Sequence, residues 1–389
     1  MKSNYDALGN YIRLVDTRNT DLVTEQVLGI NIDKYFMPSV ANVIGTDLSK
    51  YKLITKDKFA CNPMHVGRDE RLPVALYIED KPAIVSPAYF MFEVIDNSIL
   101  NEDYLMMWFR RPEFDRLCWL RTDGSVRGGI TWDDICRMKV PVPPLDEQIE
   151  IVQSYQAITD RIALKKQINN NLEATAQAVF QEQFVSFYGA DELPDGYSIV
   201  NLDSLCTVKG GKRLPADCEL LDTPTEHPYI RVRDVGSGRY VCLTNQFQYI
   251  DEETHSAISR YIVNTGDIVI SIVGTIGLLG KIHSSLDKAN LTENCVKLAN
   301  IHTVTSDYLY YTLCYKKQIK EIELLTVGAV QAKLPMYNIQ SMKILVPPTK
   351  VMEEFQNKMN VFNEQIEANT VEVQRLYELQ EVLLAKMSD

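Results

Sequence analysis

This 389-residue chain lacks the sequence features of a membrane or exported protein. Its longest apolar run, Ile268 to Leu279, is far shorter than a membrane span and contains Gly274 and Gly277 among β-branched residues. We interpret that run as buried strand and turn. The first residues, MKSNYDALGNY, are polar and do not form the apolar core of a signal peptide. We therefore expect a cytoplasmic protein with no membrane segment.

The chain also lacks a cysteine pattern typical of disulfides or metal sites. Its eight cysteines, at positions 61, 118, 136, 206, 218, 242, 295 and 314, form no Cys-x-x-Cys pair and have no companion histidine spacing. We expect reduced, mostly buried thiols and no metal site.

Familiar catalytic motifs are missing as well. The sequence contains no Gly-x-x-x-x-Gly-Lys-Ser/Thr phosphate loop, no Gly-x-Gly-x-x-Gly, no His-Glu-x-x-His and no nucleophile elbow. We assign no catalytic residue. A stand-alone DNA-modifying or DNA-cleaving enzyme with an unrecognised site stays open as the alternative function, and so does a coiled-coil scaffold with no nucleic-acid role.

Positive charge is scarce in two segments only. The net charge is −12, which at first argues against nucleic-acid binding. Residues 1–144 carry 18 Lys and Arg against 20 Asp and Glu, and residues 193–345 carry 15 against 16. Residues 145–192 have 3 against 8, and residues 346–389 have 4 against 8. Two nearly neutral blocks are therefore compatible with DNA, and two acidic segments are available to a partner protein.

The two acidic segments are copies of one pattern, 204 residues apart. Each follows a Val-Pro-Pro run, at residues 142–144 and 346–348, and proline fits the first turn of a helix. Acidic residues follow in both, where the helix dipole favours negative charge. We predict two long helices.

Alternating steps of four and three residues give each helix a mostly apolar seam. The predicted packing residues are Ile151, Tyr155, Ile158, Ile162, Leu172 and Val179 in the first helix, and Phe355, Met359, Phe362, Ile366, Leu376 and Leu383 in the second. Lys165 and Asn169 stand level in sequence with Asn369, and such a polar layer fixes register and partner choice.

The duplication extends beyond the helices. At the same offset and without a gap, Asp103-Tyr104-Leu105 aligns with Asp307-Tyr308-Leu309. Upstream of about residue 86 similarity fades, although ITKDKF from Ile54 still resembles VNTGDI from Val263, 209 residues later. The predicted order is block, helix, block, helix, with limits at residues 1–140, 141–190, 191–345 and 346–389.

Each block is predicted to mix short strands with helix. The predicted strands are 10–15, 26–32, 52–60, 74–78 and 88–94 in the first block, and 197–202, 229–232, 267–273 and 295–298 in the second. The predicted helices are 102–119 and 306–324. Pro-Asp-Gly at 194–196 is a turn signal that ends the first long helix.

Several clusters of cations are candidates for DNA contact, because arginine suits guanine edges and phosphates and lysine suits phosphates. They are His65, Arg68 and Arg71 in NPMHVGRDERLP, Arg127 in GSVRGG, Lys209, Lys212 and Arg213 in KGGKR, Arg231 and Arg233 in YIRVRDV, and Lys333 in GAVQAKLP. A basic surface turn is the alternative for 209–213. The arginines of YIRVRDV are expected to share one strand face and have nearby carboxylates as alternative partners, as do Arg68 and Arg71.

These motifs together resemble the DNA specificity subunit of type I restriction-modification systems. The resemblance spans essentially the whole chain. It rests on YIRVRDV, TGDIVISIVGTIG, SDYLYYTL and GAVQAKLPMYNIQSMKILVPP in the second half, and on GSVRGGITWDDICRMKVPVPPLDEQ in the first. The first block lacks the TGD and TIG motifs of the second, so its strands and contact residues are assigned on fewer features.

The resemblance implies an α+β fold with two mixed α/β target recognition domains, separated by two long antiparallel coiled-coil helices and related by internal duplication. Each domain would read one half of a bipartite target in double-stranded DNA, with no catalytic centre in this chain. It further implies two methyltransferase subunits docked on the helices, and restriction and translocase subunits. The resemblance puts S-adenosylmethionine, ATP and Mg in those partners, with no cofactor bound by this chain.

Overall fold

The structure is a computed structural model that describes residues 5–40, 45–64, 66–122, 128–188, 190, 192–236, 238–244, 246–328 and 332–387. The chain divides into two compact units, Met1–Ala163 with Arg375–Asp389, and Leu164–Gln374. Each unit contains one block and one part of each long helix. Among the described residues, no helix combines the length and apolarity needed to span a membrane.

The described residues of the first block form ten short strands and four short α-helices. The strands are β1 (Tyr5–Ala7), β2 (Ile12–Leu14), β3 (Val27–Ile30), β4 (Phe36–Pro38), β5 (Lys52–Ile54), β6 (Lys58–Cys61), β7 (Val74–Tyr77), β8 (Ala83–Val85), β9 (Phe90–Val94) and β10 (Lys139–Pro141). The helices are α1 (Val66–Asp69), α2 (Glu102–Phe109), α3 (Pro112–Trp119) and α4 (Trp132–Cys136), with 3-10 turns η1 (Leu8–Asn10) and η2 (Leu48–Lys50).

The second block has the same plan. Its strands are β11 (Ser198–Asn201), β12 (Thr207–Gly210), β13 (His227–Ile230), β14 (Tyr240–Val241), β15 (Gln248–Ile250), β16 (Ile268–Ser271), β17 (Leu279–Ile282), β18 (Asn290–Leu291), β19 (Cys295–Ala299) and β20 (Lys343–Val346). Its α-helices are α6 (Glu252–Ile258), α7 (Ser306–Cys314), α8 (Lys316–Leu324) and α9 (Met336–Ser341). Its 3-10 turns include η4 (Leu202–Ser204), η5 (Val232–Asp234), η6 (Ser259–Tyr261) and η7 (Ser284–Leu286).

Sheet topology repeats in the two blocks. The main sheet has the order β2-β9-β6-β7 in the first block and β12-β19-β16-β17-β14 in the second. The first and last strands of each block pair antiparallel, β1 with β10 and β11 with β20. Each block also contains one parallel pair in a second sheet, β3 with β8 and β13 with β18. The front portions, where sequence similarity fades, therefore share one fold.

An equivalent turn in each front portion shows which of their residues correspond. Asp57 and Gly266 both adopt a left-handed backbone, with φ of 64° and 83°. Each donates its N–H across the following hairpin, Asp57 to Tyr77 O and Gly266 to Ile282 O, both at 2.9 Å. The offset of 209 between ITKDKF and VNTGDI thus describes equivalent turns.

Some predicted elements are shorter than expected. The predicted strand 52–60 is two strands, β5 and β6, because the left-handed turn at Asp57 reverses the chain between them. The helix predicted over 102–119 is divided into α2 and α3, where Arg111 is extended at ψ 138° before Pro112. The helix predicted over 306–324 is likewise divided at Tyr315, which is extended at ψ 136°. The expected turn at 194–196 is present, with Gly196 at φ 82°.

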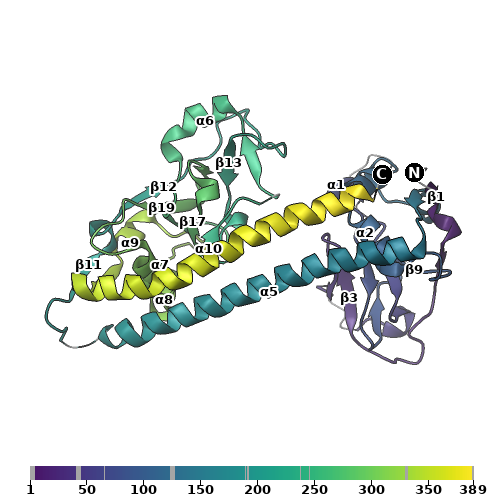
Figure 1. Ribbon diagram of the computed structural model, residues 1–389, viewed down its shortest axis with the longest axis horizontal. Coiled ribbons are helices and arrows are strands. Elements are labelled where there is room, and N and C mark those ends of the chain that lie inside the picture. The colour runs from purple at the N-terminus through teal and green to yellow at the C-terminus, as the bar shows by residue number, and fades with distance from the viewer. Residues whose placement is uncertain are drawn as a thin grey trace. The chain divides into compact units, whose positions relative to one another are not determined.

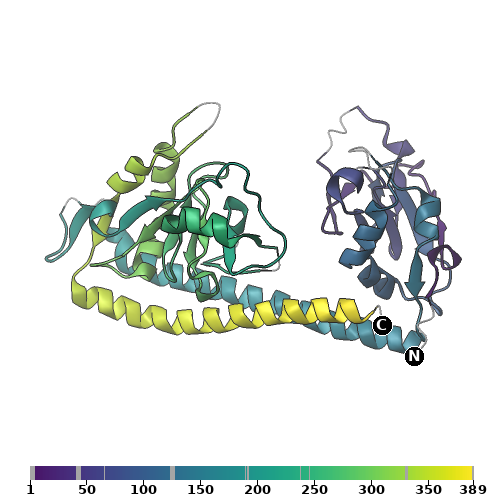
Figure 2. The ribbon, with the colours of Figure 1, turned by 90° about the horizontal axis from the view of Figure 1, so that it is seen from above.

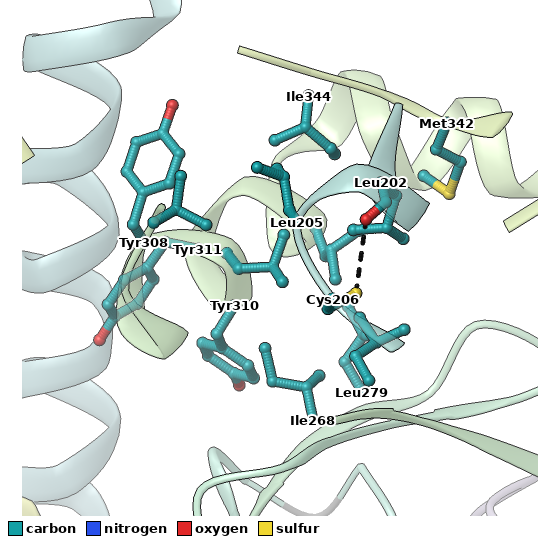
Figure 3. Packing of buried hydrophobic residues seen from close by; sticks show 14 of the residues in the cluster. Leu202, Leu205, Cys206, Ile268, Leu279, Tyr308, Tyr310, Tyr311, Met342 and Ile344 are labelled. Carbon is teal, nitrogen blue, oxygen red and sulfur yellow. Dashed lines mark hydrogen bonds between the residues drawn. The ribbon is translucent and has the colours of Figure 1, made fainter. Parts of the chain in front are cut away.

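The core of the second block lies between its main sheet and α7 (Figure 3). Tyr308 and Tyr311 of α7 are buried against the α5 side of this core, and Ile268 of β16 lies on the sheet side. Gly274 and Gly277 turn the chain between β16 and β17, both with positive φ. The run from Ile268 to Leu279 is therefore buried strand and turn, as predicted.

The two long helices are α5 (Leu145–Phe184) and α10 (Thr349–Lys386), and they run antiparallel (Figure 1). In the first unit, Gln380 Nε2 late in α10 donates to Thr159 Oγ1 early in α5, at 2.7 Å. In the second unit, Phe355 early in α10 packs edge-on against Phe184 at the end of α5, with ring centroids 5.2 Å apart. The twelve seam residues predicted from sequence are all buried or half-buried.

A polar layer crosses the helix pair within the second unit. Asn369 is buried, and its Oδ1 accepts a hydrogen bond from Lys165 Nζ at 2.9 Å. Its Nδ2 donates to Asn169 Oδ1 at 2.8 Å. Lys165 also forms an ion pair with Glu372 at 2.8 Å. A one-turn slip of either helix would leave these buried polar groups without partners, so the layer specifies the register.

All eight cysteines are free thiols. Cys61, Cys118, Cys206 and Cys295 are buried, and the other four are half-buried. Burial raises the pKa of the Cys61 thiol to about 12, so it is protonated and unreactive at neutral pH.

Candidate nucleic-acid interface

The segment Lys209–Arg213 leaves the main sheet of the second block. It is not the surface turn considered from sequence, because β12 continues through Gly210 and Lys209 pairs opposite Lys297 of β19. Of its two glycines, Gly211 is closely packed. A Cβ at Gly211 would lie 2.1 Å from Thr292 O, so no larger residue fits there. The exposed side chains of Lys209, Lys212 and Arg213 are therefore carried on rigid backbone.

Backbone hydrogen bonds attach this segment to residues 291–295. Gly211 N donates to Cys295 O at 2.9 Å, and Lys212 N donates to Leu291 O at 2.8 Å. Arg213 reaches Glu293, with Nε 2.7 Å from Oε1, while its side chain stays 81% exposed. Burial alone would raise the pKa of Glu293, but the bond from Arg213 lowers it, so the carboxylate is charged and holds the guanidinium in place.

The two arginines of YIRVRDV have different environments. They do not share a strand face, because β13 ends at Ile230 and η5 begins at Val232. Arg231 is only 15% exposed and binds Asp234, with Nε 3.1 Å from Oδ2. Arg233 is 63% exposed and binds the backbone through Nη2, 3.3 Å from Gln246 O. Arg231 holds the loop together, and Arg233 is the more exposed of the two.

Lys333 joins the same end of the sheet. It forms a β-bridge with Val273, at the beginning of the glycine-rich turn, and its neighbour Leu334 donates N–H to Ile272 O at 3.0 Å. Ile272 N in turn donates to Asn294 O at 2.8 Å, next to the segment that carries Arg213. Backbone contacts thus connect two cation-bearing segments that are far apart in sequence, 209–213 and the one that carries Lys333.

In the first block, His65 and Arg127 lie outside the described residues. Arg68 of α1 binds Asp69, with Nε 2.6 Å from Oδ1, as the sequence suggested. Arg71 binds Asp33 and not Glu70, with Nη1 3.3 Å from Oδ1. Both arginines remain more than half exposed, so each has a surface available to a phosphate.

The loops of the first block meet in the same way. Ile130 N donates to Pro63 O at 3.1 Å, which is the counterpart of the bond from Leu334 N to Ile272 O. Gly67 N donates to Gly128 O at 3.0 Å, so NPMHVGRDERLP and the segment after GSVR are neighbours. We call residues 62–71 with 128–130, and residues 209–213 with 231–233 and 333–334, the loop sets of the first and second block. The equivalent bonds from Ile130 to Pro63 and from Leu334 to Ile272 place part of each loop set at the same end of its main sheet.

Arg18 is a cation that sequence reasoning missed. It forms an isolated antiparallel β-bridge with Lys52. Arg18 Nη2 lies 2.7 Å from Asp16 Oδ1. The only sequence signal for it would have been the alignment of the front portions, which is too weak there to detect.

Groups that hold a metal are not found in the described part of the chain, where no three His, Cys, Asp or Glu side chains are suitably clustered. In the two loop sets, cationic side chains stand on backbone that is held in place by strand pairing and by close packing at glycine. Such surfaces bind phosphates and read base edges.

Comparison with known proteins connects this geometry to a family. Residues 74–174 and 194–381 match the family model described as type I restriction modification DNA specificity domain. The chain is 22% identical over 337 residues to the MjaIX specificity subunit of Methanocaldococcus jannaschii, covering 82% of this chain and 75% of the relative. It is 20% identical over 429 residues to the HindI specificity subunit of Haemophilus influenzae, covering 91% of each.

A solved structure shares the fold. The type I restriction-modification S subunit from M. genitalium superposes with a TM-score of 0.50 at 15% identity, covering 99% of this chain and 95% of that one. The α+β fold with two blocks, antiparallel coiled-coil helices and internal duplication is confirmed.

Proposed function

This chain belongs to the family of type I restriction-modification DNA specificity subunits, and from that premise we propose that each of its blocks reads one half of a bipartite DNA target. Specificity subunits are the non-catalytic, DNA-recognising components of these complexes, so the chain is a recognition subunit and not a stand-alone enzyme. The observation that supports a bipartite target is the repetition of one loop set at the same end of two equivalent sheets.

The proposed target recognition domains are residues 1–140 and 191–345, with helical spacers at 141–190 and 346–389. Pairing of β1 with β10, and of β11 with β20, supports these limits, because the paired strands close each domain where its helix begins. The helices supply a spacer whose length is set by helical geometry, at about 1.5 Å per residue.

We assign DNA contact to the exposed cations of the two loop sets. They are Arg68 and Arg71 in the first domain, and Lys209, Lys212, Arg213, Arg233 and Lys333 in the second, with Arg231 positioning Arg233. His65 and Arg127, which lie outside the described residues, are assigned to the interface from the sequence. Most of these contacts should go to phosphate, as in other protein–DNA interfaces. The carboxylate beside Arg213 keeps the guanidinium oriented before DNA arrives.

Partners complete the complex in this proposal. Two methyltransferase subunits dock on the helices, whose exposed apolar residues include Leu164, Val361, Leu379 and Val382. Restriction and translocase subunits join them, and S-adenosylmethionine, ATP and Mg act in the partners. The complex works on cytoplasmic DNA.

Selection from a random duplex pool tests this function. The chain assembled with its methyltransferase subunits should enrich two short motifs separated by a constant unread gap, and adenine methylation in the source genome should occur at the same motifs. Enrichment of one continuous motif, or of none, would contradict a bipartite target. DNA cleavage or methylation by the isolated chain would instead favour the stand-alone enzyme.

Replacing Lys209, Lys212 and Arg213 with alanine is expected to weaken binding to specific and random duplexes alike. Fewer counterions are then released, so the slope of log K against log salt should become shallower by about 0.9 for each phosphate that the variant no longer neutralises. The measurement is a binding titration at several salt concentrations.

A matched control replaces Lys316, Lys317 and Lys320, which lie on α8, with alanine. The control changes net charge equally and should leave the slope within error of the native value. Equal slopes for both triple variants would remove 209–213 from the interface.

A further inference from the structure

A buried ionic cluster joins the second domain to both long helices. Asp307 of α7 contacts Arg239 and Lys281 through Oδ1. Its Oδ2 accepts hydrogen bonds from two side chains of α10, Gln356 at 2.7 Å and Asn363 at 2.6 Å. One carboxylate thus connects the sheet, the domain helix α7 and the spacer helix.

Helix α5 enters the same cluster through Glu173. Glu173 Oε2 accepts a hydrogen bond from Tyr311 Oη at 3.0 Å, and Oε1 lies 3.6 Å from Arg239 Nη1. The guanidinium of Arg239 is 5.3 Å from the ring centroids of Tyr240 and of Tyr311. Figure 2 shows the second domain on one side of the helix pair to which these residues attach it.

The charge on Asp307 persists at neutral pH. Burial alone would raise the pKa of Asp307, but Lys281 and Arg239 hold it well below its usual range. Burial lowers the pKa of Lys281, and Asp307 opposes that shift. Removal of the Asp307 charge would leave Lys281 buried without its counter-ion and Arg239 with Glu173 alone, 3.6 Å away. A folded protein relieves such a buried charge by moving the segment that carries it.

The described residues of the first domain form no such cluster, although the aligned aspartate is present. Asp103 occupies the position of Asp307 in the duplication, but it is exposed and forms no ion pair or hydrogen bond with the described residues. Leu76 pairs with Phe59 where Lys281 pairs with Ile268, so the sheet supplies a leucine in place of the lysine.

The two long helices also differ at the positions that contact Asp307 in the second domain. Val152 and Thr159 stand where α10 has Gln356 and Asn363, 204 residues later. The first domain is held instead by Gln148, at the start of α5. This buried side chain accepts from Asn101 N at 2.9 Å and donates to Ile99 O at 2.8 Å.

We infer that the Asp307 cluster is a positioning joint, which fixes the orientation of the second domain on both helices and so sharpens the gap length that the subunit accepts. This inference rests on the proposed function for its effect on DNA. Because side chains from the sheet, the loop before it and α10 converge on one carboxylate, only one orientation of the domain satisfies them all. The first domain contacts α5 through Arg110, 6.0 Å from the Tyr155 ring centroid, but Asp103 takes part in no ionic cluster among the described residues. We therefore expect the first domain to tolerate substitution at the aligned aspartate.

The test compares Asp307→Asn with its counterpart Asp103→Asn in the complex with methyltransferase subunits. Binding is measured on duplexes that keep both half-sites and vary the gap by about one to three base pairs, each a step of ~3.4 Å. The measured quantity is the ratio of the affinity for the native gap to the affinity for an altered gap. We expect this ratio to fall about ten-fold in Asp307→Asn, because a tenfold ratio corresponds to a modest conformational bias. The half-site sequences should be unchanged. Asp103→Asn should match the native protein.

Hydrogen exchange on the purified chain tests the contacts of the Asp307 cluster independently of DNA binding. Amides of residues 356–363 and of α7 should exchange at least about ten-fold faster in Asp307→Asn than in the native chain, and at the native rate in Asp103→Asn. The conservative variant Arg239→Lys should retain most of the protection. Unchanged exchange and gap preference in Asp307→Asn would overturn the joint.

Two other outcomes are decisive. If Asp307→Asn alters half-site sequence preference, the cluster shapes the reading surface and is not a positioning joint. The native complex could also bind all gap lengths equally while hydrogen exchange responds to Asp307→Asn as expected. The cluster would then be a structural contact with no role in gap selection. In that case the proposed bipartite function itself would be contradicted.

Discussion

Exchange of residues 1–140 for the first domain of a relative should change one half-site completely and leave the other unaltered. The physical reason is that each domain is closed by its own strand pair, β1 with β10 or β11 with β20, and presents its own loop set. Methylome sequencing of a strain that carries the chimera measures both half-sites at once. Affinity for the native target should fall about a hundred-fold or more, because each mismatched base pair costs ~1–3 kcal/mol.

The reciprocal exchange, of residues 191–345, is the matched control and should change the other half-site. The gap should stay constant in both chimeras, because the helices are untouched. A chimera in which both half-sites change, or in which the gap changes with either domain, would contradict separate reading by two domains.

Lengthening both helices by one turn should lengthen the gap by about two base pairs without changing either half-site. The insertions are four residues between Asn169 and Glu173 of α5 and four between Asn363 and Asn369 of α10. Both positions lie between the polar layer and the Asp307 cluster, so each set of contacts is kept. One added turn is ~6 Å at about 1.5 Å per residue, close to two base pairs at ~3.4 Å each.

The control inserts four residues in α5 alone. The hydrogen bond between Asn169 and Asn369 and the contacts of Glu173 then cannot both form in register, so binding to every gap length should fall. Methylome sequencing reads the gap in each strain. An unaltered gap in the double insertion would show that the helices do not measure distance.

Sequence alone determined the features that depend on local periodicity and on repetition. The seam of α5 and α10, the polar layer of Lys165, Asn169 and Asn369, and the order of blocks and helices follow from the 204-residue repeat. Periodicity is readable because one face of each helix must be buried along its whole length, whatever the rest of the chain does.

Only the tertiary structure decided which cations face solvent and which are bound within the fold. Arg231 and Arg233 look alike in YIRVRDV, but η5 places Asp234 and Gln248 around Arg231 and leaves Arg233 exposed. Asp103 and Asp307 look alike in their repeats, yet of the two only Asp307 meets two cations among the residues that the structure describes. Those differences depend on segments distant in sequence, since Arg239 and Lys281 reach Asp307 through sheet packing that no local pattern encodes.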